Sequence, residues 1–125
     1  MASSQWKAIE RFVAKLLGGR RSFDTDIDVI VVTDPGMFSA DEIEEMTGAE
    51  LERHARADRL EAWAVEVKNR QDLTIPMTER FLEHNRAKAL RFHMRNALVI
   101  KRKAGSGIPT PYLLIIPLET YGEHA

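Results

Sequence analysis

Two charged side chains interrupt an otherwise apolar stretch of the sequence, WAVEVKN at residues 63–69. A strand places residues i and i+2 on the same face, so Glu66 and Lys68 should project together while Val65 and Val67 enter a core. A carboxylate beside an ammonium on a rigid strand can hold a divalent cation and stabilise the charge that develops when a phosphate ester is hydrolysed. The simpler alternative is a surface ion pair on the solvated face of the strand.

A second segment, DIDVIVV at residues 26–32, is rich in β-branched residues and predicts another strand. Its apolar side chains should share one face: Ile27, Val29 and Val31. Asp26 and Asp28 should share the other face, where either could join Glu66 if the two strands are neighbours. Acidic ligands that offer only oxygen suit Mg²⁺ or Mn²⁺ rather than zinc. We favour Asp28 because it leads directly into the apolar segment, with Asp26 as the alternative.

A third carboxylate, Glu10, lies on a predicted helix at residues 3–19 that begins near Ser3 or Ser4 and ends at Gly18-Gly19. The helix has one apolar stripe, composed of Trp6, Ile9, Val13, Leu16 and Leu17. Glu10 falls on this stripe, so it should be paired with a cation, bound to a metal or placed at the edge of the stripe. If the helix packs at the same end of the sheet, Glu10 could complete a site with a second ion.

The wider pattern resembles a known group of nucleases. It comprises Glu10-Arg11 on the leading helix, GGRRS at 18–22, DV at 28–29 and VEVKNR at 65–70. The D…ExK arrangement resembles the PD-(D/E)xK nuclease superfamily, and the whole pattern looks like the archaeal-type Holliday junction resolvases and their bacteriophage relatives. By this resemblance Asp28, Glu66 and Lys68 would be catalytic, and Asp28 and Glu66 would bind Mg²⁺, with Mn²⁺ able to substitute. Glu10 would match the family's acidic residue on the first helix and act as a further catalytic and metal-binding residue.

The same resemblance implies a homodimer that cuts two strands of a four-way DNA junction symmetrically, in DNA recombination and repair. Such an enzyme needs basic side chains for the DNA backbone. We expect these contacts from residues in loops and at strand ends near the carboxylates: Arg20, Arg21 and Arg70, with Ser22 as the match for a loop serine. Ordinary solubilising charge is the alternative for many of the chain's other basic residues.

The sequence departs from the family between the two acidic strands. Relatives usually join these strands by a short turn, whereas residues 33–60 form an insertion here. Two capping-box patterns, Ser39 to Glu42 and Thr47 to Glu50, predict short helices near 40–46 and 48–59. The insertion could be a helical cap or a dimer element. In addition, FDTD at 23–26 replaces the family's Gly/Ser loop.

The remaining elements predict an α/β fold in a single domain, residues 1–125. After the strand at 61–69 we expect a crossover helix at 78–96, a strand at 97–103, a turn at 104–111 and a strand at 112–118 ending near Pro117. The expected architecture is a mixed central β-sheet flanked by helices. It would have a restriction-endonuclease-like core and the helical insertion at about 33–60.

Composition narrows the function classes. The net charge is −1, but residues 1–23 carry +4, residues 24–66 carry −10 and residues 67–125 carry +5, so basic ends flank an acidic centre. Much of that acidity could belong to solvated helices.

The chain has no cysteine, which excludes disulfides and thiolate metal sites. Without a signal peptide or an apolar run near 18 residues, we expect a cytoplasmic protein with no membrane partner, in a prokaryotic cell or a phage-infected host.

These observations predict an Mg²⁺-dependent endodeoxyribonuclease selective for branched DNA. Two rivals remain open. One is another PD-(D/E)xK endonuclease of restriction or repair type, and the other is a non-catalytic DNA-binding assembly protein.

Overall fold

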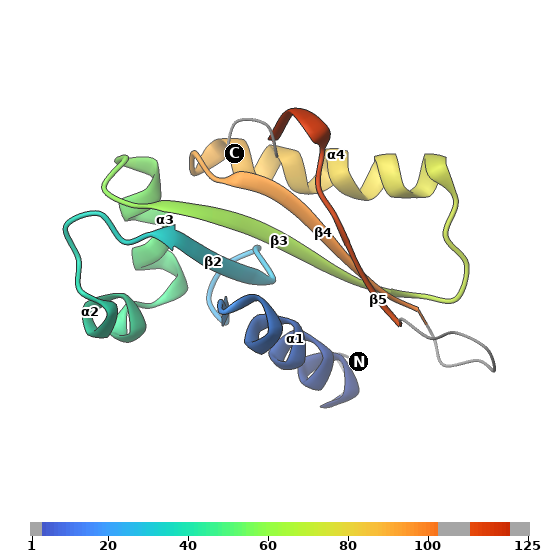
Figure 1. Ribbon diagram of the computed structural model, residues 1–125, viewed down its shortest axis with the longest axis horizontal. Helices are drawn as coiled ribbons and strands as arrows, with labels where there is room; N and C mark the ends of the chain where they lie inside the picture. The colour runs from blue at the N-terminus through green and yellow to red at the C-terminus, as the bar shows by residue number, and fades with distance from the viewer. Residues whose placement is uncertain (1–3, 103–110, 121–125) are drawn as a thin grey trace.

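In the computed structural model, which describes residues 4–102 and 111–120, five strands form one mixed sheet with helices on both of its faces (Figure 1). The elements follow in the order α1 (Ser4–Leu17), β1 (Arg20–Arg21), β2 (Val29–Asp34), α2 (Ala40–Glu45), α3 (Gly48–Arg56), β3 (Glu61–Arg70), α4 (Ile75–Arg91), β4 (Arg95–Arg102) and β5 (Tyr112–Ile115). This architecture confirms the predicted α/β class with a mixed sheet flanked by helices.

The strands lie in the sheet in sequence order, and all neighbours are antiparallel except β3 and β4. Helix α4 makes the crossover that a parallel pair requires. Strand β3 is central and pairs along its length, with Val65 opposite Val29 on β2 and Glu66 opposite Leu98 on β4. The ExK segment therefore lies on the central strand, where it pairs with β4 on one side and lies just beyond the ladder with β2 on the other.

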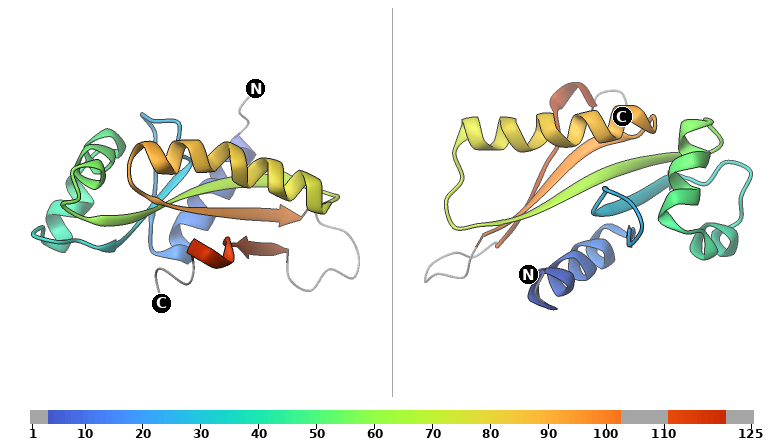
Figure 2. Two further views of the ribbon diagram at one scale, coloured as in Figure 1. Left: turned by 90° about the horizontal axis from the view of Figure 1, so that it is seen from above. Right: turned by 180° about the vertical axis from the view of Figure 1, so that it is seen from behind.

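Helices α4 and α1 lie on opposite faces of the sheet (Figure 2). An apolar cluster lies on each face. One joins α3 and α4 to the sheet through residues that include Ile27, Ile30, Leu51, Ala64 and Ala89. The other joins α1 to the opposite face through residues that include Ile9, Val13, Val29, Val65 and Val67. The prediction that Ile27 and Val29 share a face is therefore wrong. Strand β2 begins only at Val29, so the residues before it do not alternate as strand residues do.

The insertion between β2 and β3 is helical, as predicted, and both capping boxes are present at Ser39 and Thr47. It contributes Leu51, Ala55 and Leu60 to the cluster beneath α4. These helices thus belong to the core of the fold and are not an added cap, because removing them would expose one end of the sheet.

Several predicted boundaries are wrong. Helix α4 begins at Ile75, capped by Thr74, and not at residue 78. It ends at Arg91, and strand β4 begins at Arg95. The last strand ends at Ile115, before Pro117, and most of the predicted turn at 104–111 lies outside the described residues.

The short strand β1 was not predicted, because two residues carry no periodicity. It follows Gly18, which ends α1 in the left-handed region with φ 68°. It also needs Gly19, where an added Cβ would lie 2.6 Å from the carbonyl oxygen of Ile30 on β2. Within the described ranges, no helix combines the length and the apolar character that a membrane crossing requires.

Candidate functional site

The structure brings Asp28 directly beside the strand that carries Glu66. The antiparallel register of β2 and β3 places Val29 opposite Val65, so Asp28 precedes the ladder at the level of Glu66. Its Oδ2 accepts a 2.9 Å hydrogen bond from the backbone N–H of Val67. Asp26, the alternative candidate, is exposed and approaches this region through its backbone carbonyl. This placement favours Asp28 as the second carboxylate.

Glu66 is buried, and only one of its two carboxylate oxygens lies near a partner. Its side chain is 4% exposed, so solvent does not stabilise its charge. Two ammonium groups approach the same oxygen, Oε1: Lys88 Nζ at 3.6 Å and Lys68 Nζ at 3.9 Å. The other oxygen, Oε2, is buried and has no hydrogen-bond partner among the residues that the structure describes. A buried carboxylate oxygen without a partner is unfavourable unless a ligand or a water completes it.

The surroundings of Asp28 disfavour its charge. The pKa of this carboxyl is raised from an ordinary value of 3.8 to about 6, mainly by burial and to a smaller degree by the charges of Glu10 and Glu66. The Val67 N–H and the Lys88 ammonium lower it and offset part of this shift. A carboxyl whose pKa is raised by burial and by neighbouring acids is a frequent feature of cation sites and catalytic sites. A cation bound between them would remove the repulsion.

Lys68 lies at the solvent side of this cluster. Its side chain is 33% exposed, and its Nζ lies 5.1 Å from the ring centroid of Phe81 on α4. Arg70 follows on the same strand face, with its guanidinium carbon 5.8 Å from the same centroid. The ring thus lies beside two cations at the end of β3, and both can reach an anionic ligand outside the protein.

Glu10 is buried but has a dedicated partner. Its Oε1 lies 2.6 Å from Arg21 Nε, and the Arg21 guanidinium also stacks over Phe23 at 4.7 Å. Of the three expectations for Glu10, the structure therefore shows the paired one. Glu10 still influences the pKa of Asp28. Within residues 4–102 and 111–120, no three His, Cys, Asp or Glu side chains meet at metal-ligating spacing.

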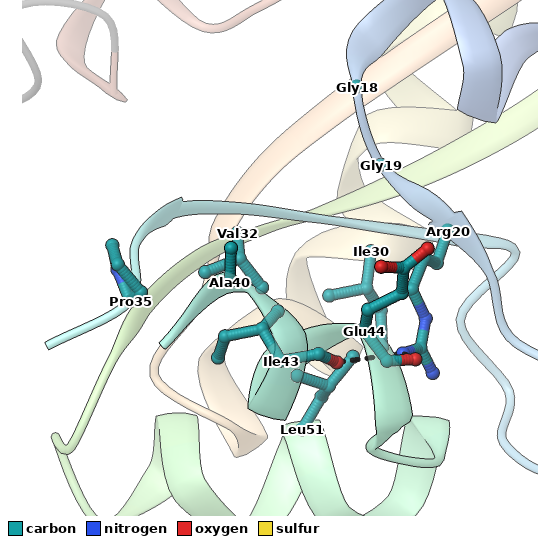
Figure 3. Close-up of a pocket in the computed structure, with 10 residues that line it drawn as sticks. All are labelled: Gly18, Gly19, Arg20, Ile30, Val32, Pro35, Ala40, Ile43, Glu44 and Leu51. Carbon is teal, nitrogen blue, oxygen red and sulfur yellow. Dashed lines mark hydrogen bonds between the residues drawn. The ribbon is translucent and has the colours of Figure 1, made fainter. Parts of the chain in front are cut away.

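The other proposed DNA contacts are directed elsewhere. Arg20 donates hydrogen bonds to the carbonyls of Ile43, Glu44 and Met46 at the end of α2. Figure 3 shows it on the wall of a cavity of about 380 Å³ that lies between β2 and α2 and contains none of the site carboxylates. Ser22 Oγ lies 2.5 Å from Thr25 Oγ1. Both residues therefore organise the local backbone, which favours a structural role over a phosphate contact.

Sequence reasoning missed Lys88 in the site and a further buried acid, Glu52, near the loop that precedes β2. Lys88 belongs to a helix with several basic residues, and no spacing distinguished it from the others. Glu52 on α3 is buried, with Oε2 unpartnered, and burial raises its pKa although a hydrogen bond from Thr25 opposes the shift. Its position directly after the buried Leu51 was the one available signal, since a charge adjoining an apolar position often lies at a buried boundary.

Comparison with protein-family models, with curated proteins and with solved structures gives no significant match.

Proposed function

We propose that this chain is a divalent-cation-dependent DNA endonuclease of the PD-(D/E)xK type, acting on four-way junctions. The observation that carries the proposal is the buried Glu66, which keeps one carboxylate oxygen unpartnered beside the raised-pKa carboxyl of Asp28. The central place of the ExK strand in a mixed sheet flanked by helices supports a restriction-endonuclease-like core.

The carboxylates suit Mg²⁺ in number and kind. Mg²⁺ is commonly held by one or two protein carboxylates, with waters and substrate phosphate oxygens as the other ligands. Asp28 and Glu66 would hold it, and Glu10 would act through its charge, because its own oxygen is paired with Arg21. Bound there, Mg²⁺ supplies Lewis-acid polarisation of the phosphate and a more acidic water.

The chain's own residues divide the remaining tasks. The partly exposed Lys68 stabilises negative charge on the scissile phosphate and orients the attacking water. Arg70, at the end of β3, contacts the neighbouring phosphate and positions the backbone without reading sequence. The buried Val67 N–H holds Asp28 in place through its hydrogen bond. Lys68, Arg70 and Val67 belong to β3 and Asp28 directly precedes β2, so the sheet fixes their relative positions.

Symmetric nicking of a junction needs two equal sites, and a two-fold dimer supplies them. We place the dimer contact on the α1 side of the sheet, because large apolar side chains are exposed there: Phe12 and Leu16 on α1 and Leu114 on β5. Light scattering on the purified protein would give twice the chain mass. A monomer at micromolar concentration would contradict this part of the proposal.

The decisive experiment is cleavage of a labelled four-way junction in Mg²⁺, with linear duplex in parallel. We expect paired symmetric nicks from the wild type and at least a hundredfold loss of rate in Glu66→Ala. Glu61→Ala is the matched control, since it removes an exposed carboxylate from the same strand and should leave the rate unchanged. Equal cutting of duplex and junction would indicate another endonuclease of the superfamily. Binding without cutting, in Mg²⁺ and in Mn²⁺, would indicate a non-catalytic DNA-binding protein.

A further inference from the structure

Lys88 extends from α4 into the carboxylate cluster and is more enclosed than Lys68. Its side chain is 17% exposed, against 33% for Lys68. The ammonium lies 3.6 Å from Glu66 Oε1 and donates a 3.0 Å hydrogen bond to the backbone carbonyl of Asp26. It therefore bridges the loop before β2 and the centre of β3, the two segments that supply the site carboxylates.

A buried polar network one turn earlier fixes the position of Lys88. The Asn85 amide is fully buried and donates to the carbonyl of Ala64 on β3 and to Asn96 Oδ1 at the start of β4. Asn96 in turn donates to the carbonyl of Leu82. Because these bonds link α4 to both parallel strands, the helix cannot slide along the sheet without losing them. The ammonium of Lys88 is thus delivered to Glu66 in a defined register.

The two lysines contact the same oxygen of Glu66 and leave the other without a partner. We propose that Lys88 is a positioning residue, which holds Glu66 through Oε1 so that Oε2 remains available to a divalent cation. This inference rests on the proposed function, since it assigns Oε2 to the cation. Partners that orient a metal-binding carboxylate typically change metal affinity or activity by about 10- to 100-fold when they are lost.

Two other roles for Lys88 make different predictions. If it only neutralises a buried acid, its removal should change folding stability and leave cation affinity unchanged. If its ammonium occupies the place of the cation, its removal should tighten cation binding. A positioning role predicts weaker cation binding, because the free carboxylate of Glu66 would rotate among several orientations.

The test compares Lys88→Met, Lys88→Gln and Lys88→Arg with Arg86→Met, which removes an exposed cation two residues away on the same helix. Titration calorimetry with Mn²⁺ alone gives the affinity, single-turnover cleavage of a four-way junction gives the rate, and thermal unfolding checks the fold. We expect Met and Gln to lower the Mn²⁺ affinity and the rate by about 10- to 100-fold. The Arg variant should restore at least part of both quantities, and Arg86→Met should change neither.

Unchanged or tighter Mn²⁺ binding by folded Lys88→Met or Lys88→Gln would overturn the positioning role, even if the wild type cleaves junctions. A wild type that neither binds Mn²⁺ nor cleaves DNA would overturn the proposed function and this inference together. If Lys88→Met does not fold, the Gln variant decides, since its amide can keep the hydrogen bond to Asp26 while lacking the charge.

Discussion

Two glutamates are buried in this protein to nearly the same degree, and their surroundings differ. Glu10 on α1 is 5% exposed and Glu66 on β3 is 3% exposed. Glu10 has a guanidinium nitrogen at 2.6 Å, whereas the nearest cation to Glu66 is an ammonium at 3.6 Å. One acid thus has a close, charge-assisted partner, and the other keeps an oxygen with no partner.

The comparison separates two uses of a buried charge. A closely paired carboxylate is neutralised in place and fastens the elements that carry the pair, here α1 and β1. A loosely paired carboxylate keeps part of its capacity to bind a further cation, at some expense of stability. We therefore interpret the Glu10–Arg21 pair as a structural device that also acts electrostatically on the site, and the region of Asp28 and Glu66 as the site itself.

The largest expected effect on stability comes from breaking the Glu10–Arg21 pair. Arg21→Met would leave Glu10 buried without its cation, so we expect the free energy of unfolding at neutral pH to fall by about 3 kcal/mol. Urea denaturation followed by circular dichroism measures this quantity. Adding Glu10→Gln should recover part of the loss, because the uncompensated charge is then gone. A loss of less than about 1 kcal/mol in the free energy of unfolding of Arg21→Met would show that this pair contributes no more than a weak surface pair.

The opposite effect is expected at Asp28, whose charge the fold disfavours. Its pKa is raised in the folded state to about 6. Between pH 3.8, the ordinary pKa of the carboxyl, and about pH 6, the folded protein therefore binds more protons than the unfolded chain. The free energy of unfolding falls as pH rises through this window. Asp28→Asn removes this penalty and can still accept the hydrogen bond from Val67. We expect it to stabilise the fold by about 2 kcal/mol above pH 6 and to match the wild type near pH 4.

Thermal unfolding of both proteins from pH 4 to pH 8 tests the prediction for Asp28. The gap between the two melting temperatures should open between about pH 4 and pH 6 and stay constant above that, and the variant should be inactive in junction cleavage. A variant that is less stable than the wild type at pH 8 would mean that the Asp28 charge stabilises the fold. That result would contradict the interpretation of Asp28 as a functional carboxylate whose charge the fold disfavours.

The smallest effects on folding stability are expected at Arg20 and Arg70, two of the residues first proposed to contact DNA. Arg20→Met removes donors from the end of α2, so we expect a loss of about 1 kcal/mol in folding stability. Its DNA affinity should keep the wild-type salt dependence, because Arg20 does not contact phosphate in our interpretation. Arg70→Met should instead leave folding stability unchanged. It should lower the slope of log DNA affinity against log salt concentration by about 1. A smaller salt dependence of DNA affinity in Arg20→Met than in the wild type would show that Arg20 contacts a phosphate.

Local chemistry explains what could be predicted from the sequence. The capping boxes at Ser39 and Thr47 involve residues three apart, and the alternation of Val65, Glu66, Val67 and Lys68 defines a strand without reference to the rest of the chain. Two glycines marked the end of α1 for the same reason. These signals are contained within one turn of a helix or a few residues of a strand.

The partners of the buried charges could not be predicted, because they depend on long-range packing. Glu10 meets Arg21 across 11 residues, and Glu66 meets Lys88 from another element. The start of α4 was misplaced because Pro76 in its first turn is compatible with a helix and gives no sharp boundary. Arg20 was assigned to DNA because its partners are backbone carbonyls, which no side-chain pattern reveals.

The two edge strands of the sheet affect how readily the protein aggregates at high concentration. Edge strands present unpaired N–H and C=O groups that can template aggregation with other chains. Here one border is the two-residue strand β1 and the other is the four-residue strand β5, with Pro117 shortly after it. Both offer few backbone groups for pairing, while β3 pairs with β2 over residues 61–65 and with β4 over residues 63–70. The fold therefore disfavours growth by sheet extension at its two borders.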